Sequence, residues 1–208
     1  DGRIAKIDLI GTPETRYAYD AIGRCDYYDL EMGASDYRVD FSYLPGAGGS
    51  STTLVSSITQ GGKTYSYTYD DCGRILSISD GTYTTGYVYD GIGQLIRVND
   101  QAADDTWVYT YDDGGNITQK RLYDYTTGTP GTVEDTVTYG YDATWDDKLT
   151  AYDGVTLSYD AIGNLANDGT YSYTWIAGHQ LASMSGAGQT LTYKYNDDGL
   201  RTQKSDGT

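Results

Sequence analysis

Glutamate, basic residues and long apolar runs are scarce in this sequence, and each shortage excludes a class of protein. Only three of the 30 acidic residues are Glu, and Glu suits helix interiors whereas Asp suits turns. The 14 Lys and Arg residues are scattered and the net charge is −16, which argues against direct binding to DNA or RNA. No apolar run approaches the length of a membrane span. We therefore expect neither a helical protein, nor a nucleic-acid binder, nor a membrane span.

Histidine and cysteine are almost absent, which leaves few nucleophile–base pairs for an enzyme. The single histidine, His179, stands in a turn without a placed partner, and a lone histidine is not a catalytic site. Cys25 and Cys72 occupy different positions of the repeat described below. We interpret them as unpaired thiols, with a disulfide left open if the host protein is secreted. The sequence predicts no enzyme, no catalytic residue, no cofactor and no metal site.

Tyrosine and glycine are abundant instead, with 24 and 27 copies. Tyr favours strands, whereas Gly and Asp favour turns, so the composition indicates an all-β chain. The pattern Tyr-x-Tyr-Asp-x-x-Gly-Arg, intact or worn, recurs at intervals of 14 to 30 residues. Its positions are Tyr17, Tyr19, Asp20, Gly23, Arg24, Tyr67, Tyr69, Asp70, Gly73, Arg74, Tyr87, Tyr89, Asp90, Gly93, Tyr109, Tyr111, Asp112, Gly115, Tyr159, Asp160, Gly163, Tyr193, Tyr195 and Gly199.

Each copy of the motif predicts a β-hairpin. Tyr-x-Tyr has the period of a strand, so both rings share a face. The Asp carboxylate can accept a hydrogen bond from the backbone N–H two residues on, and the Gly adopts positive φ cheaply. The unit is too short for a strand–helix–strand crossover. No linker interrupts the repeats, so we predict a single domain over residues 1–208 in which consecutive hairpins form a curved, spiralling sheet.

The motif also suggests how neighbouring hairpins meet. Stacked copies place the tyrosines of one unit beside those of the next, and Arg24 and Arg74 could lie over neighbouring rings. A closed core of so many tyrosines would leave many hydroxyl groups without partners. A sheet with one face lining a wet cavity would not. The sequence therefore favours a wall over a filled barrel.

The motif resembles the YD repeat of the Rhs family, which also occurs in toxin-complex C components, wall-associated bacterial proteins and teneurins. The resemblance runs from about Tyr17 to Arg201. It implies a β-strip that spirals into a hollow shell around a variable, often toxic, C-terminal polypeptide. It also implies a secreted or cell-surface bacterial protein. The family's Asp-Pro-x-Gly core segment is missing, because none of Pro13, Pro45 and Pro130 follows an Asp.

The expected partners follow from that resemblance. They are other repeats of a longer parent protein and the enclosed polypeptide. We interpret the chain as an internal segment of the shell wall, without protease and without cargo. Such a fragment should have uncovered strand edges, through which copies could self-associate.

Three other functions were weighed against this structural one. Paired aspartates such as Asp70-Asp71 could serve acid–base catalysis, but turn chemistry explains them better. The oxygen-rich segment 112–116 could bind calcium, although it matches neither calcium-loop spacing nor the nonapeptide repeat. Trp107, Trp145 and Trp175 could stack on sugars in a carbohydrate-binding or surface-adhesion module.

Overall fold

The computed structural model describes residues 2–8, 14–31 and 36–207, and it confirms the all-β prediction. These residues contain strands, turns and one short 3-10 helix, η1 (Ala47–Gly49), and no α-helix. The chain divides into two compact units. Unit 1 comprises Asp1–Val108 and Tyr123–Thr132, and unit 2 comprises Tyr109–Leu122 and Val133–Thr208. The single domain over residues 1–208 stays a prediction.

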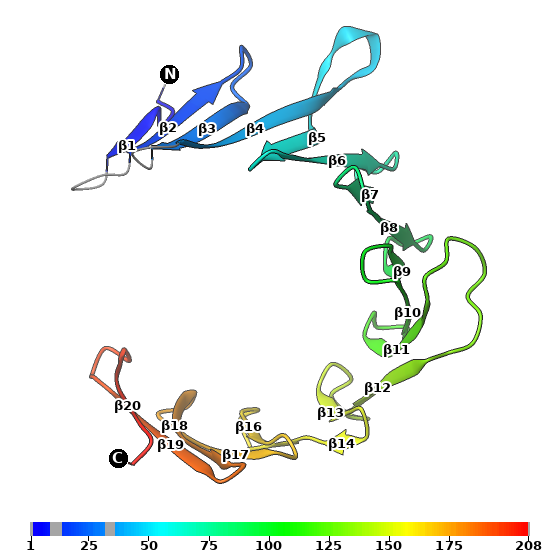
Figure 1. Cartoon of the computed structure of the whole chain (residues 1–208). Coiled ribbons are helices and arrows are strands. Elements are labelled where there is room, and N and C mark those ends of the chain that lie inside the picture. The colour runs from blue at the N-terminus through cyan, green and yellow to red at the C-terminus, as the bar shows by residue number, and fades with distance from the viewer. Residues whose placement is uncertain (1, 9–13, 32–35, 208) are drawn as a thin grey trace. The chain divides into compact units, whose positions relative to one another are not determined.

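Unit 1 is a run of antiparallel strands in which chain neighbours are also sheet neighbours (Figure 1). The strands are β1 (Lys6–Asp8), β2 (Glu14–Tyr19), β3 (Cys25–Glu31), β4 (Asp36–Pro45), β5 (Ser51–Gln60), β6 (Lys63–Tyr69), β7 (Ile75–Ser79), β8 (Thr84–Tyr89), β9 (Leu95–Asp100) and the first part of β10 (Asp105–Tyr111). This order is what a chain of short hairpins produces, because each turn returns the next strand beside the last.

Unit 2 repeats the same construction. Its strands are the first part of β11 (Ile117–Asp124), then β12 (Asp135–Tyr141), β13 (Leu149–Tyr152), β14 (Val155–Thr156), β15 (Ser158–Tyr159), β16 (Leu165–Asn167), β17 (Tyr171–Ile176), β18 (Gln180–Gly186), β19 (Gln189–Tyr195) and β20 (Arg201–Ser205). β11 to β14 pair in sequence order, and β15 to β20 form a separate six-stranded sheet.

A β-bulge recurs at the second tyrosine of the motif. The strand register shifts between Thr68 and Tyr69 and again between Val88 and Tyr89. The last hairpin has the same shift before Tyr195. A bulge adds one residue on one strand and turns it locally, so it brings the strand into the Asp turn at the same point of each hairpin.

Very little of the described chain is fully buried. Its buried apolar side chains are Val39, Tyr123 and Val137. Along β6 the three tyrosines are half-buried, while Ser66 and Thr68 between them are exposed. On β6 the aromatic side chains therefore gather on one face of the sheet, and few side chains of the described residues are fully covered. No helix in the described ranges has the length and apolarity needed to cross a membrane.

Candidate functional site

The carboxylate of the motif aspartate accepts the hydrogen bonds that hold the turn together. One oxygen of Asp70, Oδ1, accepts hydrogen bonds from the backbone N–H groups of Cys72 and Arg74, each at 2.9 Å. The other oxygen, Oδ2, accepts from Nε of Arg74 at 2.6 Å. The backbone N–H and the guanidinium of Arg74 lower the pKa of the Asp70 carboxyl. Gly73 closes the turn with φ of +81°. The expected carboxylate-capped turn with a positive-φ glycine is therefore confirmed here.

The same turn recurs with small changes of residue. In each of the following pairs the aspartate Oδ1 accepts the backbone N–H four residues later: Asp20 and Arg24, Asp90 and Gln94, Asp112 and Asn116, and Asp160 and Asn164. The glycines Gly23, Gly93, Gly115, Gly163 and Gly199 all have positive φ. In the last hairpin Asn196 replaces the aspartate, and its Oδ1 accepts from Leu200 N–H.

The motif arginine joins one hairpin to the next. The guanidinium carbon of Arg24 lies 4.1 Å from the ring centre of Tyr43, and that of Arg74 lies 4.7 Å from the ring centre of Tyr89. The predicted stacking on neighbouring rings is therefore confirmed. A Cβ built on Gly93 would lie 2.9 Å from the guanidinium of Arg74, the mobile end of that side chain, so the stronger reason for glycine there is its φ of +94°.

The hydroxyl of the second tyrosine makes a further link that sequence reasoning missed. The Tyr89 hydroxyl donates to the Ile75 carbonyl of the preceding hairpin at 2.9 Å. Equivalent bonds run from Tyr19 to Ile4, Tyr43 to Cys25, Tyr69 to Val55, Tyr141 to Ile117, Tyr159 to Leu149 and Tyr195 to Leu181. The donor and acceptor are 14 residues apart in several copies. Over all seven copies the separation ranges from 10 to 24 residues, so no fixed spacing in the sequence marks the link.

The two faces of the sheet differ in chemistry. The residue between the two tyrosines points away from the rings, and in several hairpins its hydroxyl pairs across the strands. Thr68 pairs with Ser77 at 2.6 Å, and Thr110 pairs with Thr118 at 3.0 Å. Such cross-strand hydroxyl pairs stabilise a sheet modestly. The sheets therefore have a hydroxyl-rich face and an aromatic face.

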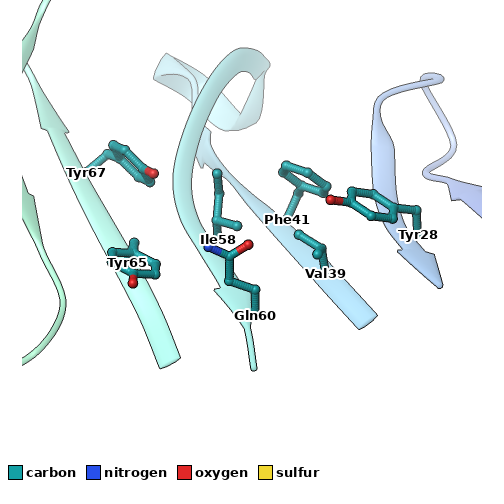
Figure 2. A pocket seen from close by; sticks show the side chains of 7 residues that line it. All are labelled: Tyr28, Val39, Phe41, Ile58, Gln60, Tyr65 and Tyr67. Carbon is teal, nitrogen blue, oxygen red and sulfur yellow. The ribbon is translucent and has the colours of Figure 1, made fainter. Parts of the chain in front are cut away.

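The aromatic face of unit 1 contains a shallow hollow of about 280 Å³. Figure 2 shows its lining side chains, which come from β3, β4, β5 and β6 and are Tyr28, Val39, Phe41, Ile58, Gln60, Tyr65 and Tyr67. The rings of Tyr28 and Phe41 lie 6.1 Å apart. The lining has no carboxylate, histidine, lysine or arginine, and its polar groups are one amide and three phenol hydroxyls, so it suits contact with apolar side chains.

The residues considered for chemistry are used in structural contacts. Nδ1 of His179 lies 2.5 Å from Oδ1 of Asn164, which links two neighbouring hairpins. The two cysteines are free thiols, and burial raises the pKa of Cys25, which disfavours the reactive thiolate. Asp112 directs both oxygens at turn donors, including Nδ2 of Asn116 at 3.1 Å. The described residues contain no group of three or more His, Cys, Asp or Glu side chains able to hold a metal.

The tryptophans differ in their surroundings. Nε1 of Trp175 donates to the Leu165 carbonyl at 2.7 Å and so takes the linking role of the second tyrosine. Trp107 lies on β10 opposite Val98. Trp145 is 59% exposed.

A long loop, residues 125–134 between β11 and β12, is also fixed by contacts that sequence reasoning missed. The Arg97 guanidinium donates to the carbonyls of Gly128, at 2.6 Å, and Thr126. Thr106, which is fully buried, bonds both the N–H and the carbonyl of Thr126. The loop covers part of the hydroxyl-rich face of β9 and β10, where Asn99 is also buried.

Comparison with known proteins places this geometry among known folds. No protein-family model matches the chain. Over 61 residues it is 38% identical to the tRNA nuclease WapA of Bacillus subtilis strain 168 and to the tRNA3(Ser)-specific nuclease WapA of Bacillus spizizenii. Those matches cover 28% of this chain and 3% of each relative.

Solved structures cover far more of the chain. The Photorhabdus luminescens Tc holotoxin pore matches 94% of it with a TM-score of 0.56, and the TcdB2-TccC3-Cdc42 structure matches 94% with a TM-score of 0.58, each at 16% identity. TcdB2-TccC3 without its hypervariable C-terminal region matches 92% at 0.53 and 17% identity. The chain spans only 12–13% of those chains. The predicted resemblance is thus confirmed in the fold: the chain is built as the Rhs/YD-repeat shells of Tc toxin chains are built.

Proposed function

We propose that this chain is a structural, non-catalytic segment of a YD-repeat shell that encloses a C-terminal, toxin-like polypeptide. The observation that carries the proposal is the use of the motif side chains. The motif aspartate and arginine hold the turn of one hairpin closed. The arginine and the tyrosine hydroxyl also contact a neighbouring hairpin. The aromatic rings are left on one face, where they can contact another polypeptide.

The nature of the enclosed partner follows from the two properties of that face. Its lining in unit 1 is aromatic and aliphatic with one amide, and all of its side chains except the buried Val39 are half-buried. The chain as a whole carries a net charge of −16. An unfolded polypeptide exposes apolar side chains, and a basic one is drawn to an acidic wall. One structural neighbour bears a hypervariable C-terminal region in its intact form, which is consistent with a wall that contacts many sequences.

The location of the parent protein is inferred from the family resemblance. We infer a bacterial protein that is secreted or attached to the cell surface, as expected from the resemblance to toxin-complex and wall-associated repeat proteins. Other repeats of the parent are the partners along the sheet, and the enclosed polypeptide is the partner on the aromatic face.

A binding titration tests the contact between the wall and its cargo. Lysozyme that has been reduced and alkylated with iodoacetamide serves as a basic, permanently unfolded probe. We expect saturable, salt-sensitive binding that Tyr65→Ser weakens several-fold. The matched control is Ser66→Ala, which changes the neighbouring residue on the opposite face and should leave binding unchanged. Absence of binding, or equal losses in both variants, would contradict the proposal.

Adhesion to carbohydrate is the second candidate, and exposed Trp145 is the observation in its favour. The residue is 59% exposed, and the Lys148 ammonium lies 5.9 Å from the ring centre. An exposed indole can stack on a sugar face. Glycan-array binding that Trp145→Ala abolishes, with the fold intact by circular dichroism, would favour adhesion over the enclosing wall.

A further inference from the structure

In the hairpin of β12 and β13, the first motif tyrosine lies opposite a second tyrosine. The strand register pairs Tyr139 on β12 with Tyr152 on β13. In the hairpin of β6 and β7, the first tyrosine faces an aliphatic side chain instead, because Tyr67 is paired with Ile78. Two phenols therefore meet in β12 and β13 at a place where that more complete motif brings together a phenol and an alkyl group.

The backbone pairing brings the two phenols close together. The Asp153 N–H donates to the Thr138 carbonyl at 2.8 Å. Tyr139 and Tyr152 therefore form a non-hydrogen-bonded pair, the kind in which facing side chains lie closer. Their ring centres are 5.2 Å apart, with the ring planes at 75°. Burial and then the neighbouring Tyr152 phenol raise the pKa of Tyr139, as expected when two phenol oxygens lie near each other.

One member of the pair is open to solvent. Tyr152 is 42% exposed, whereas Tyr139 is half-buried. The tyrosine–carbonyl link of β12 is made by the next tyrosine, because the Tyr141 hydroxyl donates to the Ile117 carbonyl. An oxidant in solution can therefore reach one phenol of the pair directly, and the second phenol lies in ring contact with the first.

The turn of this hairpin lacks the closing contacts of a complete motif. Trp145 stands where the motif has glycine, and Oδ1 of Asp142 accepts from its N–H at 2.9 Å. The backbone N–H of Asp142 donates to the Lys148 carbonyl, so the turn is longer than in the motif. Among the described residues, no ion pair corresponds here to the one between Asp70 and Arg74. A covalent bond between the strands would hold this hairpin closed where the motif contacts are missing.

We propose that Tyr139 and Tyr152 form an oxidative cross-linking site, at which a peroxidase that uses hydrogen peroxide joins them as dityrosine. Each phenol gives up its hydroxyl hydrogen atom and becomes a phenoxyl radical. The radicals join through a ring carbon ortho to each oxygen, and the hydrogen on each of these carbons moves to the oxygen as a proton, which restores both hydroxyls. Hydrogen peroxide takes up the two hydrogen atoms and is reduced to two molecules of water.

Proximity selects this pair among the 24 tyrosines. Coupling between positioned neighbours is much faster than coupling between separate molecules in solution. A second pair among the described residues, Tyr17 and Tyr28, has ring centres 5.9 Å apart, and both of its members are half-buried. The closer and more open pair should react first. The inference concerns a bond within one hairpin, so it does not depend on the proposed enclosure of a polypeptide.

The first experiment maps the bond by digestion. The chain is oxidised in dilute solution with a haem peroxidase and hydrogen peroxide, and the monomer is separated from cross-linked oligomers by size exclusion. Trypsin cleaves after Lys148, so the two tyrosines fall on separate peptides, residues 122–148 and 149–194. We expect a joined peptide with a mass two hydrogen atoms below the sum of these two, and with dityrosine fluorescence. Absence of this joined peptide from the oxidised monomer would overturn the proposal.

Two variants test which tyrosines are joined. Tyr152→Phe keeps the ring and removes the phenol, so the yield of the joined peptide should fall about tenfold. Tyr193→Phe is the matched control, because it removes another half-buried phenol from the same tryptic peptide and should leave the yield unchanged. An undiminished yield in Tyr152→Phe, or a product that joins residues 98–120 to residues 122–148 in its place, would assign the coupling to other tyrosines and refute this site.

The second experiment measures what the bond does to the hairpin. A cross-link between Tyr139 and Tyr152 restricts the unfolded chain as a disulfide does. Oxidation should therefore raise the melting temperature of the unmodified chain by about 5 °C and leave that of Tyr152→Phe unchanged. The backbone amides of β12 and β13 should also exchange more slowly with solvent after oxidation of the unmodified chain. Equal shifts in the two proteins would contradict a bond that holds this hairpin closed.

Discussion

At the scale of single residues, the motif tyrosines divide into two kinds. The first tyrosine contributes its ring to the aromatic face. The second contributes its hydroxyl to the carbonyl of the preceding hairpin, as Tyr69 does to Val55 at 2.7 Å. Burial raises the pKa of Tyr69, in keeping with its sheltered hydroxyl. Two identical residues on one strand thus differ in what their removal should cost.

Replacing the two tyrosines separately tests this division. Tyr69→Phe keeps the ring and removes the donor, which leaves the Val55 carbonyl without its partner. We expect a loss of about 0.5–1.5 kcal/mol in the free energy of unfolding, measured by urea denaturation. Tyr67→Phe is the control and should change stability by much less, because among the described residues its hydroxyl makes no hydrogen bond. Equal losses would assign the link to the ring instead of the hydroxyl.

At the scale of elements, the hairpins could be predicted from sequence and the links between them only in part. The Asp turn depends on residues two and four positions apart, so local pattern reveals it, as with Asp70 and Arg74. The aromatic contact of Arg74 was also accessible, because the motif recurs. The tyrosine–carbonyl link was not, because a backbone carbonyl has no residue signature.

The long loop after β11 shows the same limit more strongly. Its position depends on Arg97, which lies 29 and 31 residues from the loop carbonyls that it binds. No short-range pattern marks such a pair. The Arg97 fork supplies two donors in fixed geometry, which suits two carbonyls of one loop.

Releasing that loop gives an element-scale prediction. Arg97→Gln removes the guanidinium that binds the two loop carbonyls. Loss of roughly one net hydrogen bond should raise the population of the opened loop about fivefold. We therefore expect proteinase K to cut residues 125–134 about fivefold faster. Arg121→Gln changes an exposed arginine on β11 and should leave the rate unchanged. If Arg97→Gln is cut at the original rate, the contacts of Thr106 and the backbone bond from Tyr125 N–H to the Asp104 carbonyl are sufficient to hold the loop.

At the scale of the whole molecule, protonation of aspartates limits the stability of the fold at low pH, and ionisation of tyrosines limits it at high pH. Carboxylates in the turns, such as Asp70 and Asp112, have lowered pKa values because backbone donors bond them in the folded state. Their contribution is present above the unfolded value near 3.8 and is lost as pH falls through the lower folded value. The acid limit is therefore expected below about pH 4.

The alkaline limit is set by tyrosine and can be tested at one hydrogen bond. Tyr173 donates to Asp168 at 2.6 Å, which raises the pKa of Tyr173 to about 12. The unfolded phenol titrates near 10, so the contribution is present below about pH 10 and is lost as pH rises to about 12. Urea midpoints of the unmodified chain and Tyr173→Phe should therefore differ at pH 8 and converge by pH 12. A difference that stays constant across this range would contradict the assignment.

The tyrosine–carbonyl link has a consequence for cooperativity. Each such bond couples a hairpin to its immediate predecessor and to no other, so stability should accumulate as hairpin terms plus nearest-neighbour terms. A chain coupled in this way can nucleate at any hairpin and grow in either direction. Because its contacts are local, it should form quickly. The number of residues between donor and acceptor varies from 10 to 24, and the bond forms at both extremes. Extra residues between motifs therefore lengthen loops without breaking the chain of links.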